Sequence, residues 1–171
     1  FRQDTGTSSG VLSEDATTAL SGRLYASDVD AGDPDNVFNS GSLTASYGAF
    51  AIDSSGNWTY SLDSSSVQFL AQGETRIESF TVSATDGTAT TLSVRVDGVN
   101  DSAQFTGALS VSASEPASPG TLIISGQVYA NDVDGGDYLQ AKTATGSYGT
   151  IAVQSNGTWT YTIDSSQYDF D

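Results

Sequence analysis

The stretch SGRLYASDVD, residues 21–30, occurs a second time as SGQVYANDVD, residues 125–134, which lies 104 residues further along the chain. A second segment, GNWTY at residues 56–60, returns as GTWTY at residues 157–161, 101 residues later. A repeat of this length exceeds the roughly 20 to 50 residues of a solenoid unit and matches a small independent domain. The sequence therefore predicts tandem copies of one domain. The predicted copies are residues 1–101 and residues 102–171.

Apolar and polar residues alternate through much of both copies. Phe80, Val82 and Ala84 are separated by single threonine or serine residues, and Trp58 and Tyr60 are separated by a threonine. A period of two indicates β-strands with one face buried and the other in water. Gly, Ser, Asp and Asn cluster between these segments, as turns require. The pattern predicts an all-β fold in which each copy is a β-sandwich.

The second copy keeps apolar residues at the inward positions of the first. Trp58 and Tyr60 return as Trp159 and Tyr161. Positions that stay apolar after a duplication are expected to lie in the core, so both tryptophans are interpreted as packing residues. The alternative is an exposed platform on which a sugar ring stacks.

Two expected strands of the first copy have no counterpart in the second. Residues 77–84 and 91–97 are the predicted last two strands of the first copy, and the sequence stops at Asp171 before they recur. A sandwich that lacks two strands exposes sheet edges and half of its core. The second copy is therefore expected to be incomplete. It is either truncated or completed by strand exchange with another chain, and the sequence leaves both alternatives open.

The charge of the chain is strongly negative, with 21 acidic residues against 5 basic ones and a net charge of −16. The basic residues are scattered singly, so nucleic acid is excluded as an expected partner. An anionic membrane surface would repel the chain, and no apolar run approaches the roughly 20 residues that membrane insertion requires. Divalent cations would relieve the repulsion among the carboxylates. The alternative explanation is acidic solubility, which the charge alone favours equally.

Neither cysteine nor histidine occurs in the chain. Disulfides, thiol sites and the Ser-His-Asp triad are thereby excluded, as is the commonest ligand of transition metals. Paired carboxylates could serve a glycosidase, but the acidic residues lie mainly in loops that both copies repeat. We therefore expect the chain not to be an enzyme.

An ordered set of short motifs runs through the first copy, and the second copy repeats about the first two-thirds of it. The set includes Ser13-Glu14-Asp15, Gly22-x-Leu24, Asp28-Val29-Asp30, Tyr47-Gly48, Gly56-x-Trp58-Thr59-Tyr60, Gly73-Glu74, Thr85-Asp86-Gly87 and Val99-Asn100-Asp101. This set resembles the VCBS repeat, a cadherin-like domain of large bacterial surface proteins and RTX-type adhesins.

The resemblance implies tandem cadherin-like or immunoglobulin-like β-sandwich domains, secreted or exposed on the bacterial cell surface. Such domains extend an adhesin and support cell adhesion or biofilm attachment. The resemblance also implies that the partners of each domain are neighbouring repeats of the same polypeptide, and that Ca²⁺ stiffens the array.

Two loops place carboxylates at a spacing that suits a metal ion. Asp28-x-Asp30-x-Gly32-Asp33 and Asp132-x-Asp134-x-Gly136-Asp137 each hold three carboxylates within six residues. Alternate Asp residues in a tight loop can direct oxygen atoms at one centre, and Ca²⁺ prefers carboxylate oxygens. Solvated turns use the same residues, so the alternative is an acidic loop without an ion. The presence of the pattern in both copies favours Ca²⁺ as a cofactor.

The resemblance implies further ligands, because cadherin-type domains bind Ca²⁺ where successive domains join. The implied ligands come from an acidic residue near the domain start, from the linker, and from the D-x-D and Thr-Asp-Gly motifs of the following domain. Here the linker departs from the cadherin D-x-N-D pattern, which leaves the number of ions open. The candidate ligands are Glu14, Asp28, Asp30, Asp33, Asp86, Asp97, Asn100, Asp101, Glu115, Asp132, Asp134 and Asp137.

A Ca²⁺-dependent carbohydrate-binding β-sandwich is the alternative function, with cell-surface glycans as partners. Exposed tyrosines would serve it, among them Tyr138, which has no counterpart in the other copy. A pure spacer would bind no glycan, so glycan binding distinguishes the two functions.

Overall fold

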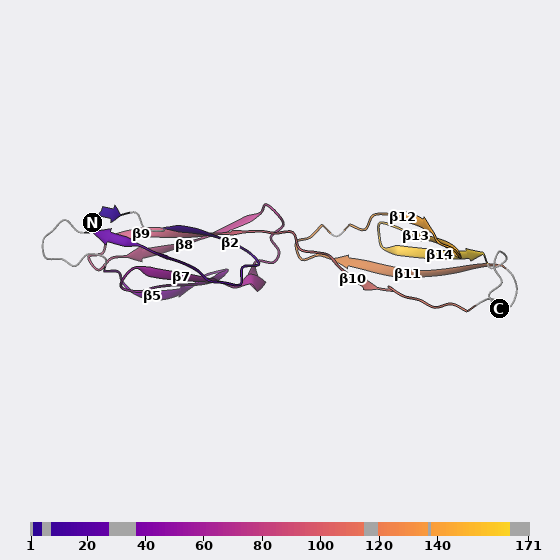
Figure 1. The fold of residues 1–171 in the computed structure, drawn as a ribbon, viewed down its shortest axis with the longest axis horizontal. Helices are drawn as coiled ribbons and strands as arrows, with labels where there is room; N and C mark the ends of the chain where they lie inside the picture. Colours follow the sequence, from indigo (N-terminus) through magenta and orange to yellow (C-terminus); the bar gives the residue numbers. More distant parts are fainter. Residues whose placement is uncertain (1, 5–7, 28–36, 115–119, 137, 165–171) are drawn as a thin grey trace. The chain divides into compact units, whose positions relative to one another are not determined.

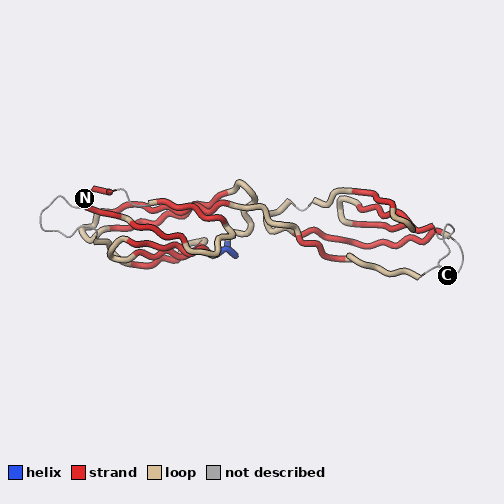
Figure 2. The backbone as a smooth tube through the Cα atoms, in the orientation of Figure 1, coloured by secondary structure: helices blue, strands red, loops and turns tan. Residues whose placement is uncertain are grey.

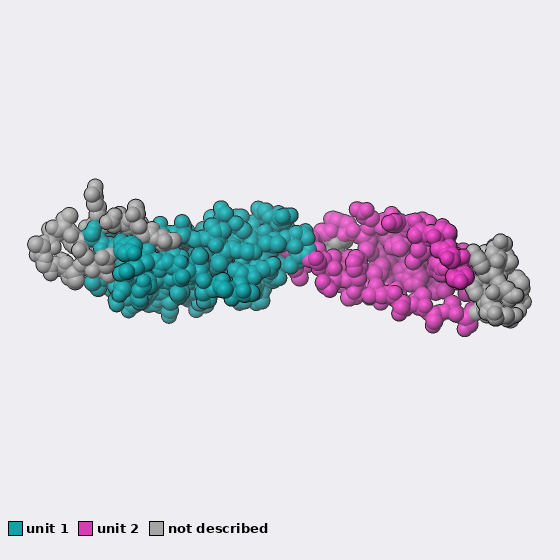
Figure 3. All heavy atoms as spheres, in the orientation of Figure 1, with its two compact units in different colours: residues 1–101 teal, residues 102–171 magenta. Residues whose placement is uncertain are grey.

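A computed structural model describes residues 2–4, 8–27, 37–114, 120–136 and 138–164 of the chain. The chain divides into two compact units, Phe1–Asp101 and Ser102–Asp171, which are teal and magenta in Figure 3. Strands dominate both units, and unit 1 adds a single turn of 3-10 helix, η1 (Ser64–Ser66), as Figure 2 shows. The all-β class expected from the sequence is confirmed. No helix in these described ranges is long and apolar enough to span a membrane.

Unit 1 contains a four-stranded antiparallel sheet in the order β3-β7-β6-β5 (Figure 1). A tight turn joins β6 to β7, and in it Asp53 Oδ1 accepts hydrogen bonds from the backbone amides of Ser55 and Asn57 at 2.9 Å. Gly56 completes the turn with a φ of 81°, a conformation that favours glycine. The hydrogen bond from the Asn57 side chain is the main cause that lowers the pKa of Asp53. The strands are β3 (Leu20–Arg23), β5 (Gly41–Thr44), β6 (Gly48–Ile52) and β7 (Asn57–Leu62).

A three-stranded sheet in the order β2-β9-β8 forms the other layer of unit 1 (Figure 1). β8 and β9 form an antiparallel hairpin, whereas β2 runs parallel to β9. The parallel register pairs Ser9 with Ser93 and Ser13 with Asp97. The strands are β2 (Ser9–Ser13), β8 (Thr75–Ser83) and β9 (Ala89–Asp97), and a short ribbon adds β1 (Arg2–Asp4) and β4 (Tyr25–Ser27).

The two sheets of unit 1 enclose an apolar core. Phe50 and Trp58 come from the four-stranded sheet and are each 1% exposed, while Leu92 and Phe80 come from the other sheet. The rings of Phe50 and Phe80 stack with their centroids 4.5 Å apart. Burial of each large apolar side chain contributes about 1.5–3 kcal/mol to folding. The sandwich and the packing role of Trp58 are therefore confirmed.

A buried carboxylate lies between the sheets of unit 1. Glu78, on β8, is 7% exposed. It accepts hydrogen bonds from the hydroxyl of Tyr60 on β7 and, at 2.9 Å, from the backbone amide of Tyr47. Burial and the hydrogen bond to Glu78 raise the pKa of Tyr60 far above its usual range. These contacts satisfy a charge that would otherwise be costly to bury.

Unit 2, over its described residues, is one five-stranded antiparallel sheet in the order β10-β11-β14-β13-β12. The long strand β11 pairs with β14 through its first seven residues and with β10 through its last four. Trp159, on β14, is 7% exposed, so its predicted packing role is also confirmed. The strands are β10 (Gln104–Gly107), β11 (Thr121–Asn131), β12 (Lys142–Thr145), β13 (Gly149–Val153) and β14 (Thr158–Asp164).

The described part of unit 2 contains no second sheet. Residues 110–114 occupy the position of β2 at an offset of 101 but lie outside any strand, and Leu109, just before them, and Val111 are 64% and 48% exposed. In unit 1 the edge strand β2 is hydrogen-bonded to β9, for which unit 2 has no described counterpart. Without that neighbour, residues 110–114 have no ladder to join.

Candidate metal centre

Glu14 is the most deeply buried acidic residue described in unit 1, with 0% exposure. It directly follows β2, and the parallel pairing with β9 carries it beside the end of that strand. Its backbone amide donates to the carbonyl oxygen of Asp97 at 3.0 Å, and its Oε1 atom accepts from the backbone amide of Val99 at 2.5 Å. The side chain of Glu14 therefore holds the segment that leaves β9.

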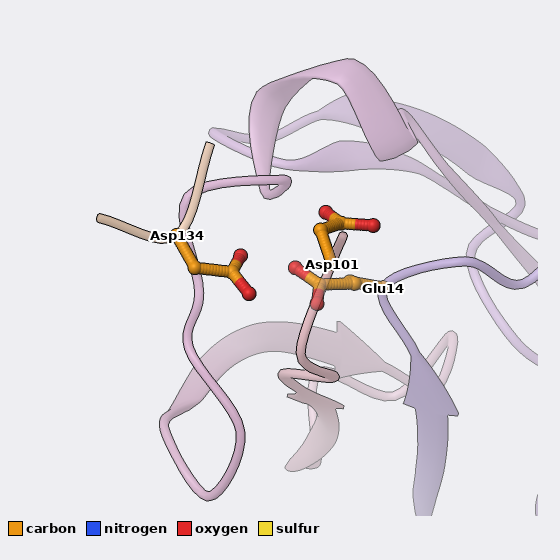
Figure 4. A group of neighbouring side chains, drawn as sticks. All are labelled: Glu14, Asp101 and Asp134. Atoms are coloured by element: carbon orange, nitrogen blue, oxygen red, sulfur yellow. The ribbon is translucent and has the colours of Figure 1, made fainter. Parts of the chain in front are cut away.

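Asp101 lies at the end of that segment, and its carboxylate is close to that of Glu14. One carboxylate oxygen of Glu14 lies within 4.8 Å of one carboxylate oxygen of Asp101, and Figure 4 draws both side chains. Two carboxylates at this distance repel one another unless a cation or a proton reduces their charge. Hard oxygen donors of this kind suit Ca²⁺ better than a transition metal. The residues present therefore fit a Ca²⁺ ion.

The other two linker candidates are placed differently. The carboxylate of Asp97 forms a two-pronged ion pair with Arg95, with Nε to Oδ1 at 2.7 Å and Nη2 to Oδ2 at 2.9 Å. Asn100 is exposed, and its Nδ2 atom donates to the carbonyl oxygen of Asp101 at 2.5 Å. The guanidinium of Arg95 therefore competes with a metal ion for the carboxylate of Asp97.

Asp86 lies in the turn between β8 and β9, at the opposite end of that hairpin from Asp97. It is exposed, and its carboxylate accepts from the backbone amide and the hydroxyl of Thr88 at 2.8 and 2.9 Å. The structure therefore does not bring Asp86 together with Glu14 and Asp101. The two carboxylates of that pair gather at one end of unit 1, and Asp86 belongs to the other end.

Unit 2 presents the acidic loop that contains Asp132 and Asp134, both half-buried. The backbone amide of Asp134 donates to Oδ1 of Asp132 at 3.1 Å, and Figure 4 draws the side chain of Asp134. Gly135 and Gly136 follow with φ values of 79° and 92°, so the chain curls tightly at this point. Such a turn serves either a bound ion or solvent. The remaining candidates, Asp28, Asp30, Asp33, Glu115 and Asp137, lie outside the described residues.

Two features near these residues were not predicted from the sequence. The contact between Glu14 and the Val99 amide depends on the parallel pairing of β2 with β9, which no local pattern reveals. The buried Glu78 had a visible signal, because it shares the inward face of its strand with Phe80 and Val82. A charged residue at an inward position indicates a buried polar contact.

Two family models match the chain. Residues 3–98 match the model of a bacterial cadherin-like domain, and residues 100–171 match that of a bacterial Ig domain. Comparison with curated proteins gave no match.

Solved structures share the fold at low sequence identity. Protocadherin Gamma B2 extracellular cadherin domains 1–5 align over 95% of this chain with a TM-score of 0.55 and 16% identity, and the protocadherin gammaB7 EC3-6 cis-dimer over 95% with 0.50 and 17%. The chain covers 32% and 39% of those chains. A Ca²⁺-stabilized adhesin that helps an Antarctic bacterium reach out and bind ice aligns over 91% of this chain and 38% of its own, with 19% identity. Its TM-score of 0.28 is too low to bear on the fold.

Proposed function

The chain belongs to the family of bacterial cadherin-like domains, and from that premise we propose that it is a structural repeat of a cell-surface adhesin, stiffened by Ca²⁺. The observation that carries the proposal is the close pair of carboxylates of Glu14 and Asp101 at the end of unit 1. A cation bound between these two carboxylates would relieve their repulsion, and Ca²⁺ is abundant outside a cell.

Within this proposal the repeat is of the VCBS type and belongs to an RTX-type adhesin that supports cell attachment or biofilm formation. The sequence resemblance adds Asp132 and Asp134 of the following repeat as further ligands. Neighbouring repeats of the same polypeptide are then the partners, and no catalytic step is required of any residue. A net charge of −16 makes the loss of the ion costly, because the carboxylates would again repel one another.

Thermal unfolding of the whole chain in EDTA and in millimolar Ca²⁺, with Mg²⁺ as the control ion, tests the proposal. At about ten times its Kd each site adds about 1.4 kcal/mol to the stability of the bound state. For a domain of this size that corresponds to a rise in Tm of several degrees, roughly 4–8 °C per kcal/mol. Equal melting temperatures in EDTA and in Ca²⁺ would contradict the proposal.

Variants that remove one carboxylate test whether Ca²⁺ binds at Glu14 and Asp101. Asp101→Asn removes one charge and is expected to abolish most of the rise in Tm that Ca²⁺ produces. Glu14→Gln tests the other ligand but also alters the contact with the Val99 amide, so its melting temperature in EDTA serves as its own baseline. The matched control is Glu74→Gln, which removes an exposed charge at the same end of unit 1 but neither carboxylate of the Glu14–Asp101 pair, and it should leave most of the Ca²⁺ response in place.

Carbohydrate binding is a second candidate, which exposed tyrosines favour. Tyr129, Tyr138 and Tyr148 are 54%, 88% and 55% exposed, and aromatic rings of this kind can stack on sugars. The burial of both tryptophans removes the stronger platform that the sequence had offered. A glycan array probed in Ca²⁺ separates the two functions, since a spacer binds none of the glycans.

A further inference from the structure

The outer strand β5 of the four-stranded sheet in unit 1 carries no charge. No described strand pairs with its outer edge, and residues 37–52 contain no charged side chain in a chain whose net charge is −16. Exposed edge strands of natural sheets usually carry a charge or a proline, which keeps other strands from pairing with them. Two other edge strands of unit 1 follow this rule, since β3 contains Arg23 and β8 contains Arg76. The edge of β5 lacks this protection.

The equivalent edge strand of unit 2 differs from β5 in charge and in size. At an offset of 101 residues, β12 reads Lys-Thr-Ala-Thr where β5 reads Gly-Ser-Leu-Thr. Unit 2 therefore has Lys142 in the place of Gly41, and Ala144 in the place of Leu43. A lysine on an edge strand discourages pairing with another strand. Its absence from β5 is thus a property of that strand and not a requirement of the fold.

The ladder between β5 and β6 shows which backbone groups of β5 face outward. The amide of Ala45 donates to the carbonyl oxygen of Gly48 at 2.8 Å, and the antiparallel register continues from there through the strand. Hydrogen-bonded pairs alternate along such a ladder, so Leu43 bonds toward β6. Ser42 and Thr44 direct their N–H and C=O groups away from β6. The edge therefore offers two donors and two acceptors to another strand.

A groove beside this edge opens toward the apolar core of unit 1. It has a volume of about 230 Å³, and residues of β5 and β8 line its two sides. Phe50 and Ile52 also line it and are 1% and 8% exposed, whereas Leu43 at its rim is 52% exposed. An apolar side chain laid against Leu43 would remove this surface from water, which is favourable.

We propose that β5 pairs with β5 of a second copy of this chain, in antiparallel orientation about a two-fold axis at Leu43. Ser42 of each copy exchanges backbone hydrogen bonds with Thr44 of the other, and the two Leu43 side chains meet beside the grooves. A second copy fits because the edge is complementary to itself under the two-fold and neither strand brings a charge. This inference goes beyond the proposed function and does not depend on its Ca²⁺ site.

Cysteine crosslinking tests the pairing, because the chain contains no cysteine of its own. Leu43→Cys places two thiols opposite one another, at a pair whose Cα atoms lie about 4.5 Å apart, within the range that a disulfide spans. The matched control is Ala144→Cys, which occupies the same position on the exposed edge strand β12. In a glutathione redox buffer, Leu43→Cys should form the disulfide-linked dimer at least about tenfold faster than the control, in EDTA as well as in Ca²⁺. Equal rates for the two variants would overturn the proposal.

Two further substitutions test the geometry. Thr44→Pro removes an outward amide and leaves the ladder with β6 intact. Gly41→Lys gives β5 the charge that β12 carries, and a side chain added at Gly41 meets nothing within 4 Å. Each of them, combined with Leu43→Cys, should lower the crosslinking rate to that of Ala144→Cys. Near-ultraviolet circular dichroism, which reports the packing of the buried tryptophans, verifies that the variants are folded. Crosslinking that neither substitution slows would contradict pairing through this edge.

Sedimentation of the natural chain tests the same contact without a thiol. Its average mass should rise with concentration toward that of a dimer. The variant that combines Gly41→Lys with Leu43→Ala, and so gives β5 the residues of β12, should stay monomeric. Dimers that persist unchanged in this variant would place the contact elsewhere on the chain and overturn the proposal. A natural chain that stays monomeric at every concentration would point to a strand of another protein as the occupant, and would equally contradict it.

Discussion

The hydroxyl of Tyr60 donates a hydrogen bond to the buried carboxylate of Glu78, and this contact joins the two sheets of unit 1 through the core. The same carboxylate holds the backbone amide of Tyr47. One acidic side chain thus fixes β8 against both β7 and the loop before β6. A misaligned strand would leave the carboxylate unpaired in an apolar core, so the contact specifies the register of the sandwich.

We expect Tyr60→Phe to destabilise unit 1 by about 1–3 kcal/mol, because the variant leaves a buried acceptor with one partner fewer. Urea unfolding followed by tryptophan fluorescence measures the change. Tyr25→Phe is the matched control, since it removes the same hydroxyl from a tyrosine that is 43% exposed. A loss as small as that of the control would show that the hydrogen bond contributes nothing net.

Alkaline pH should weaken unit 1 through the same residue. The pKa of Tyr60 is raised in the folded state, chiefly by burial and then by Glu78, so the folded chain keeps a proton that the unfolded chain loses near pH 10. The free energy of unfolding is therefore expected to be flat below about pH 10 with respect to Tyr60, and to fall as the pH rises above that value. Tyr60→Phe should flatten this decline relative to the natural chain, and an unchanged slope would contradict the assignment.

Alanine substitutions at three glycines of unit 1 distinguish the cost of a strained backbone conformation from the cost of a steric clash. Gly56 has a φ of 81°, and a methyl group there would meet the Leu24 carbonyl oxygen and the Phe38 ring. Gly73 has a φ of 90° in open space, and Gly41 has open space without a positive φ. Alanine substitution is expected to cost most at Gly56, about 1–2 kcal/mol at Gly73, and least at Gly41. Chemical unfolding of the three variants gives the order, and equal costs at Gly56 and Gly73 would rule out the steric conflict.

Calcium should change the average shape of the chain in solution if it stiffens the array. We expect small-angle scattering to report a narrower distribution of maximum dimensions in Ca²⁺ than in EDTA, and Asp101→Asn to reduce the difference. Glu74→Gln is again the control. Superimposable scattering profiles in the two buffers would rule out stiffening even where Ca²⁺ raises the melting temperature.

The core of this fold was predictable because its signal is local. Trp58 and Tyr60 point inward since they alternate with polar residues, and their recurrence in the second copy removes the ambiguity that a single occurrence would leave. The tight turn at Gly56 follows from the residues around it in the same way.

The candidate site was only partly predictable because it depends on distant contacts. Glu14 and Asp101 are far apart in the sequence. The parallel pairing of β2 with β9, which Glu14 and Asp101 respectively follow, brings their carboxylates together. Asp97 shows the converse, since Arg95 lies two residues away on the same face of β9 and takes its carboxylate. Motif resemblance identifies acidic residues of the right kind, whereas the folded structure decides which of them lie close to a second carboxylate.

The parallel pairing of β2 with β9 has a mechanical consequence. The two strands flank unit 1 along the chain and run in the same direction, so a pull on its two ends slides them past one another. Under such a shearing load the hydrogen bonds of the ladder share the force and must rupture together, whereas an antiparallel terminal pair would peel open one bond at a time. Single-molecule pulling of the whole chain should therefore show one high-force rupture for unit 1. A surface protein that anchors a cell in flowing water experiences this load each time the tether tightens.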